Sequence, residues 1–180
     1  LAVPGGVSRC LKQEEISMLE SILKDLEKLV DEIAAFFDNK VVKSEVFQKY
    51  LSDEAYTLKT YYMGLVGRDN TLEFYDGLLK IIDAEGREVA LFKPGEYTEY
   101  IAEHSTSWSY SKFPYLRKLG WRGFNEDSVL RVGPLARLNV VDKVPTEKAG
   151  EEYREMISFF GKKLVHNTMA YHWARIIETV

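Results

Sequence analysis

Apolar residues recur every three or four positions across residues 13–38, with Glu and Lys filling most positions between them. They are Ile16, Leu19, Leu23, Leu26, Leu29, Val30, Ile33 and Phe37. This period places them on one face of a helix, and Asp38-Asn39 is a typical helix stop. The pattern therefore predicts a long amphipathic helix. Its apolar stripe is expected to form core or helix-packing surface, rather than a site for a membrane or a partner helix.

Two shorter helices are predicted to follow. Ser44 is a candidate cap for a helix over residues 44–51, because its hydroxyl can accept a hydrogen bond from the first turn. Residues 52–63 also step helically and predict a third, short helix. Gly64 and Gly67 then break the pattern.

A β-hairpin is predicted at about residues 77–92. Residues 78–83 are apolar and β-branched, a turn follows, and residues 88–92 are expected to pair back. A helix is expected over residues 96–103, because Pro94 stands near its start. The aromatic stretch 105–120 is expected to be a loop.

Helices dominate the predicted last third of the chain. The expected elements are a short β segment at 129–132, a helix opened by Gly133-Pro134 and running to Asn139, a helix over 147–160 capped by Thr146 and ended by Gly161, and a last helix from Val165 onward. The whole pattern predicts a single domain over residues 1–180 with an α+β, mainly α fold: a helical domain carrying one small β-hairpin.

Composition narrows the class of protein. The 180 residues are 46% hydrophobic and 29% charged, as in ordinary globular proteins. The net charge of -4 gives no electrostatic reason to expect nucleic acid or an anionic membrane as a partner. No apolar run approaches the roughly 20 residues of a membrane helix. A single cysteine fits a reducing compartment, so a cytoplasmic location is expected.

Two apolar stretches carry the candidate chemistry. Residues 128–142 and 164–178 are rich in Val, Leu and Ile but also contain side chains that are costly to bury unless paired. These are Arg131, Arg137, His166, Asn167, His172 and Arg175, with Asn139 beside them. Two such stretches are expected to wrap a polar centre or to meet a partner that supplies anions. For each arginine, a pairing that merely fixes the fold is the competing interpretation.

A metal site built from this chain alone is not expected. His166 and His172 lie six residues apart, so a helix would point them to different sides. Cys10 is the only cysteine, and no base accompanies it in the sequence. No glycine-rich phosphate loop or serine-nucleophile motif occurs. The chain is therefore predicted to hold neither catalytic residues nor metal ligands.

Several segments together resemble the large, catalytic subunit of nickel–iron hydrogenases, most closely the cytoplasmic bidirectional, cofactor-coupled branch. RVGPLARLNV at residues 131–140 and VHNTMAYHWARIIE at residues 165–178 carry most of the likeness. DGLLKIIDAEGREV at residues 76–89, WSYSKFPYLRK at residues 108–118 and AVPGGVS at residues 2–8 add to it. The resemblance covers nearly the whole chain and is specific only as a set.

The resemblance implies a particular place in that protein. The family binds its nickel–iron centre through two Cys-x-x-Cys pairs, and this chain has neither. The chain is thus expected to be the central fragment of a large subunit, inactive alone and prone to self-association. The intact enzyme would split dihydrogen reversibly and pass electrons to an iron–sulfur small subunit. The six residues Arg131, Arg137, His166, Asn167, His172 and Arg175 would then stand behind the ligands of the metal pocket.

Two other classes stay open at this level. One is a metal-free, hydrogenase-like subunit related to respiratory complex I, which would keep the fold without nickel. The other is an unrelated protein–protein interaction module, in which the long N-terminal helix docks a partner and the resemblance is accidental. A fold without a helical core around residues 128–142 would favour the second.

Overall fold

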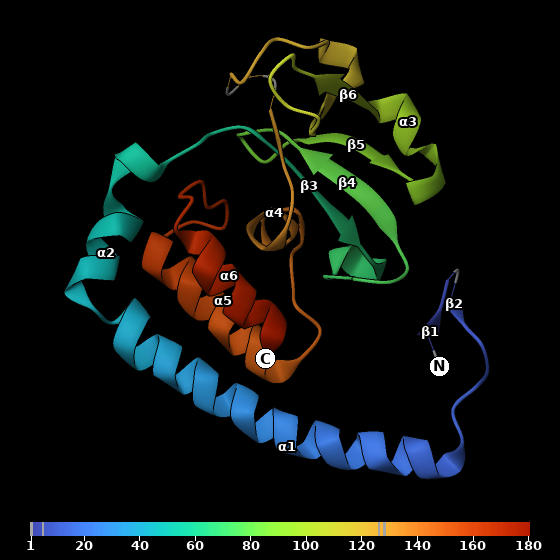
Figure 1. Cartoon of the computed structure of the whole chain (residues 1–180). Coiled ribbons are helices and arrows are strands. Elements are labelled where there is room, and N and C mark those ends of the chain that lie inside the picture. Colours follow the sequence, from blue (N-terminus) through green and yellow to red (C-terminus); the bar gives the residue numbers. More distant parts are fainter. Residues whose placement is uncertain (1, 5, 126, 128) are drawn as a thin grey trace.

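The computed structural model describes residues 2–4, 6–125, 127 and 129–180. Figure 1 shows helices gathered on one face of a small sheet, with one long helix running along the far side of the helical layer. The fold is α+β and mainly helical, as predicted. None of the helices in the described part of the chain has the length and apolar composition that crossing a bilayer requires.

The helices are α1 (Gln13–Phe37), α2 (Glu45–Ser52), α3 (Tyr97–Tyr100), α4 (Pro134–Val140), α5 (Glu147–Phe160) and α6 (Ala170–Thr179). A π-helical turn at Asp38–Val42 joins α1 to α2. Single 3-10 turns occur at Glu54–Tyr56, Arg68–Asn70, Pro94–Glu96 and Arg117–Leu119. Ser44 caps α2 as predicted, because its Oγ accepts a hydrogen bond from the Phe47 amide.

The central sheet has four strands in the order β5-β4-β3-β8. The bounds are β3 (Tyr61–Val66), β4 (Leu78–Ile82), β5 (Glu88–Phe92) and β8 (Leu130–Arg131). β4 and β5 form the predicted hairpin, and β3 extends it antiparallel to β4. β8 joins β3 in parallel register, with Tyr61 opposite Leu130. Two separate hairpins are β1 (Ala2–Val3) with β2 (Gly6–Val7), and β6 (Ile101–Ser105) with β7 (Lys112–Leu116).

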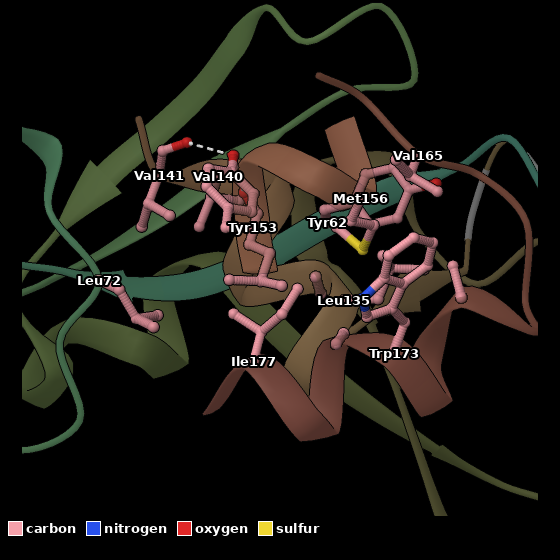
Figure 2. Packing of buried hydrophobic residues seen from close by; sticks show 14 of the residues in the cluster. Tyr62, Leu72, Leu135, Val140, Val141, Tyr153, Met156, Val165, Trp173 and Ile177 are labelled. Atoms are coloured by element: carbon pink, nitrogen blue, oxygen red, sulfur yellow. Dashed lines mark hydrogen bonds between the residues drawn. The ribbon is translucent and has the colours of Figure 1, made fainter. Parts of the chain in front are cut away.

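The main core lies where α4 is enclosed by β3, α5 and α6. Figure 2 shows Leu135 and Val140 of α4 among Trp173 and Ile177 of α6, Met156 of α5 and Tyr62 of β3. Five of the seven α4 residues are buried. Gly64 permits this packing, because a β-carbon there would lie 2.7 Å from Val140 Cγ2 and 2.9 Å from Arg137 Cα. Such distances are too short for any larger residue to fit without a shift.

Several predicted elements differ from the structure. Residues 52–63 are not a third helix, because strand β3 begins at Tyr61 and pairs with β4 from Tyr62 on. The expected helix over 96–103 is limited to α3, since residues from Ile101 on form strand β6. The aromatic stretch 105–120 contains β7 rather than only loop. Ser128, the first residue of the apolar stretch 128–142, and Gly5 lie outside the described residues.

Candidate functional site

The two polar-rich stretches, residues 128–142 and 164–178, contact each other in the fold. Asn139 of α4 is buried and pairs with the backbone of Val165 like one rung of a sheet. Its Nδ2 donates to the Val165 carbonyl at 2.8 Å, and its Oδ1 accepts from the Val165 amide at 3.0 Å. Both halves of the amide are therefore satisfied inside the core, which removes the penalty for burying it.

Asn167 joins the same segment to the end of α2. Its Nδ2 donates to the carbonyls of Tyr50 and Leu51, each at 2.9 Å. Those carbonyls belong to the last turn of α2 and lack partners within that helix. The Asn167 Oδ1 accepts from the Met169 amide at 2.8 Å. The Asn167 side chain thus caps the C-terminal end of α2 and the N-terminal end of α6.

Arg131 binds neutral acceptors rather than a carboxylate. Its Nη1 donates to the His166 carbonyl at 2.8 Å and the Leu58 carbonyl at 3.2 Å, and its Nη2 donates to Thr168 Oγ1 at 2.5 Å. The guanidinium also lies 5.3 Å from the ring centroid of Tyr171, a distance at which the ring attracts a cation. Arg131 therefore ties β8 to two other segments.

His166 forms a buried pair with Tyr62. The Nδ1 of His166 lies 2.6 Å from the Tyr62 hydroxyl, which also lies 3.2 Å from the Leu58 carbonyl. Burial and, to a lesser extent, the positive charges of Lys162, Lys59 and Arg131 together lower the pKa of His166 to about 4. Burial likewise raises the pKa of Tyr62 to about 12. Both groups are neutral at pH 7.

A cavity of about 700 Å³ opens beside this pair. It lies between the end of α2, the end of α5 and the segment before α6, and Lys59, Lys162 and His166 line it with Glu54 and Thr57. Two ammonium groups against one carboxylate favour an anionic or carboxylate group in the cavity. A histidine with a pKa near 4 is too weakly basic for efficient proton abstraction at neutral pH.

The other predicted site residues, Arg137, His172 and Arg175, do not line this cavity. Arg137 makes a bidentate pair with Glu178 of α6, with Nε–Oε1 and Nη2–Oε2 distances of 2.7 Å and 2.6 Å. This hydrogen bonding raises the pKa of Arg137. Arg175 is exposed, with its guanidinium 5.9 Å from the Tyr171 ring centroid, and His172 is exposed. The structure thus brings Arg131, His166 and Asn167 together, and leaves the other three outside that cluster.

Sequence reasoning missed Tyr62, Lys59, Lys162 and Thr168. Lys59 and Tyr62 stand in the stretch that was predicted to be helical, so their position beside His166 was hidden. No local pattern marks any of the four. They come close to His166 only because the segment around residue 57 pairs with the segment around residue 167, which is distant in the chain. The only local sign was the unusual density of polar residues around His166.

The side chains that the structure describes do not form a binding site for a metal ion or an iron–sulfur cluster. Iron–sulfur clusters are held by several cysteine thiolates, whereas this chain has only the exposed Cys10. Within residues 2–4, 6–125, 127 and 129–180, no three His, Cys, Asp or Glu side chains gather in a way that could hold a metal ion. The residues present do not fit such a group.

Comparisons with known proteins place the chain beside hydrogenase subunits. It is 36% identical, over 98% of its length, to the iron-sulfur subunit of the F420-non-reducing hydrogenase of Archaeoglobus profundus, and 33% identical, over 98%, to the beta subunit of the NAD-reducing hydrogenase HoxS of Cupriavidus necator. A chain in the crystal structure of an NAD+-reducing NiFe-hydrogenase in the H2-reduced state matches 99% of it, with a TM-score of 0.80 and 30% identity. No family model matches.

The chain spans little more than a third of these proteins: 37% of the first relative, 36% of the second and 38% of the crystallised chain. The similarity therefore concerns one part of a hydrogenase subunit, and it says nothing about the remaining part.

The expected type of subunit must be corrected. The archaeal relative is described as an iron–sulfur subunit, and on that description the prediction of a central fragment of a large, nickel–iron subunit is wrong. The implied nickel–iron centre is wrong for the same reason, and so is the expected partnership with a separate iron–sulfur subunit. The physical cause of the error is that the segments that carry the resemblance belong to the hydrophobic core: Leu135, Val165 and Trp173 are buried. Such residues specify a fold and do not identify a cofactor.

Proposed function

We propose that this chain is part of a hydrogenase subunit of the kind described as iron–sulfur in its archaeal relative, within a cytoplasmic oxidoreductase that acts on dihydrogen. The observation that carries the proposal is the match to a hydrogenase chain over 99% of this sequence at 30% identity and a TM-score of 0.80. The 36% identity to the Archaeoglobus profundus protein also supports the proposal.

Within that larger protein, the chain is proposed to supply structure and to bind no cofactor itself. A single exposed cysteine does not meet the ligand requirement of an iron–sulfur cluster. Arg131, His166 and Asn167 instead hydrogen-bond to other segments of the chain. Ligands for any cluster would have to come from outside these 180 residues.

Arg131, His166 and Asn167 are proposed as positioning residues. They hold β8, the end of α2 and the segment before α6 in fixed relation, through hydrogen bonds to backbone carbonyls and to Tyr62. Arg137 does the same between α4 and α6 through Glu178. His172 and Arg175 are exposed in this chain, so they are proposed to face other parts of the protein.

The hydrogenase assignment is tested on the complete enzyme that contains this segment, purified without oxygen. Hydrogen-dependent reduction of a viologen dye is the expected activity. Arg131→Met should lower the yield of assembled enzyme and its thermal stability, because the carbonyls of His166 and Leu58 each lose one donor and Thr168 Oγ1 loses its guanidinium partner. Arg68→Met, which removes an exposed guanidinium, is the matched control and should leave both unchanged. A fully assembled enzyme without hydrogen-dependent dye reduction would contradict the assignment.

The cofactor-free role is tested on the chain itself. After incubation with ferrous iron and sulfide without oxygen, iron and acid-labile sulfide are measured on the desalted protein. We expect neither above background. Stoichiometric cluster uptake would overturn this role while leaving the hydrogenase assignment intact.

A further inference from the structure

Helix α1 carries a broad apolar stripe. At about 100° per residue, its large apolar residues fall within one arc of the helix surface. All but Met18 use three positions of every seven, and Met18 stands at the edge of the arc. The stripe consists of Ile16, Met18, Leu19, Ile22, Leu23, Leu26, Leu29, Val30, Ile33, Phe36 and Phe37. A stripe of this width is typical of a helix buried in a bundle, since a two-stranded coiled coil needs only two positions.

The described residues leave most of this stripe uncovered. None of the 25 residues of α1 is buried. Leu23 is 57% exposed and Phe36 63% exposed. Contact with the rest of the chain is concentrated near the C-terminal end, where Val30 and Phe37 are partly buried and Asp31 pairs with Lys148 of α5. Figure 1 shows the remainder of α1 extending past α5 and α6. Of the two predicted uses of the stripe, core is therefore wrong within the described residues, and a helix-packing surface stays a prediction.

The borders of the stripe are acidic on both sides. Glu20 and Glu27 follow one edge, and Asp25 and Glu32 follow the other. Both lysines of the helix, Lys24 and Lys28, lie on the face opposite the stripe. A helix that docks along the stripe would therefore meet negative charge on each side, and basic side chains at its own borders would pair with that charge.

We propose that the stripe of α1 docks a helix whose own apolar stripe is bordered by Lys or Arg, and that this helix comes from the part of the hydrogenase subunit outside these 180 residues. The second clause rests on the proposed function. The relatives are much longer than the matched segment. From Ile16 to Phe37 the stripe has no charge at its centre, and in this it resembles a permanent interface rather than a transient one.

The same charges disfavour a second copy of this chain as the occupant. Two copies of α1 paired through their stripes would set Glu20 and Glu27 against acidic borders of the partner. Like charges facing each other across a helix pair are unfavourable. The borders therefore select for a helix of opposite charge.

Two synthetic helical peptides test this directly. Both carry the same leucine stripe, one bordered by Lys and the other by Glu, and binding to the full chain is followed by fluorescence anisotropy. We expect the Lys-bordered peptide to bind at least about tenfold more tightly, a difference of one decade in Kd. Equal binding of the two peptides would overturn the proposal, as would a stable dimer of the chain through α1 in sedimentation.

Matched substitutions locate the contact. Leu26→Asp places a charge in the centre of the stripe and should weaken binding of the Lys-bordered peptide by about tenfold or more. Ser21→Asp adds the same charge on the polar face and should leave binding within about twofold. Circular dichroism checks that both variants stay folded. Unchanged binding of a folded Leu26→Asp chain would overturn the proposal.

The source of the helix is tested in the complete protein. A photo-crosslinking amino acid at position 26 should form adducts with a segment of the same polypeptide outside residues 1–180. Adducts with a different polypeptide or with a second copy would overturn the intramolecular source. This outcome is independent of hydrogen-dependent activity, so failure here is distinguishable from failure of the proposed function.

Discussion

Helices α4 and α1 are both rich in apolar residues, yet they are opposite in burial. Five of seven residues of α4 are buried, including the polar Asn139, whereas no residue of α1 is buried. Around α4, buried polar groups are hydrogen-bonded to backbone from distant segments. Along α1, the link to the rest of the chain includes an exposed ion pair between Lys148 and Asp31. The apolar residues of α4 are buried by other parts of this chain, whereas those of α1 need a further surface to cover them.

The largest contrast is expected from truncating an apolar side chain in each region. Trp173→Ala should lower the free energy of unfolding by about 4 kcal/mol, because the indole is fully buried and leaves a cavity. Leu23→Ala on the exposed stripe should change it by less than about 0.5 kcal/mol. Urea unfolding measures both. Similar losses in the two variants would contradict the contrast.

A smaller loss is expected from breaking the polar link to Val165. Asn139→Leu removes one donor and one acceptor and leaves the Val165 amide and carbonyl without partners in the core. The free energy of unfolding should fall by about 3 kcal/mol, since each orphaned buried group costs roughly 1–3 kcal/mol. Gln48→Leu, at an exposed side-chain amide on α2, serves as the control. An Asn139→Leu chain as stable as the wild type would contradict the account of this link.

A third difference should appear with pH. Because the pKa of His166 is lowered to about 4 in the folded chain, only the unfolded chain takes up this proton between about pH 6.5 and 4. The folded state is therefore favoured above pH 6.5, and stability falls as the pH drops through this window, by about 3 kcal/mol for this group at pH 4.

The control for this pH effect is His166→Gln, because carboxylates with lowered pKa, such as Asp142 and Asp83, act in the same direction. The difference in unfolding free energy between wild type and variant isolates the histidine. A difference that stays constant from pH 7 to pH 4 would show that His166 is not buried in its neutral form.

Local sequence patterns predicted elements whose stability is local. The heptad period of α1, the hairpin β4–β5 and the Gly133-Pro134 start of α4 all follow from short-range geometry. The strand β3 was missed because its residues also fit a helical step, and pairing with β4 decided the outcome. The last helix begins at Ala170 rather than Val165. Residues before Ala170 are bound in other ways: the Asn167 Oδ1 accepts a hydrogen bond from the Met169 amide, and the backbone of Asn167 forms a β-bridge with Thr57.

The candidate site was predictable only in part. Clustered polar residues among apolar ones predicted one polar centre behind a metal pocket for six residues, of which the structure brings Arg131, His166 and Asn167 together. Their partners could not be read from the sequence, because Leu58, Tyr62 and Tyr50 lie more than 70 positions away in the chain. The burial state of α1 was also beyond reach, since an amphipathic stripe predicts a partner surface but not where that surface is.

Hydrogen–deuterium exchange of the full chain, with and without the Lys-bordered peptide, tests the contrast between these regions most directly. The account predicts slow exchange in α4 and α6, fast exchange over residues 13–29 of α1, and slowing of α1 alone when the peptide is added. Exchange in α1 as slow as in α4 without any peptide would contradict it, because the helix would then be stable without a partner.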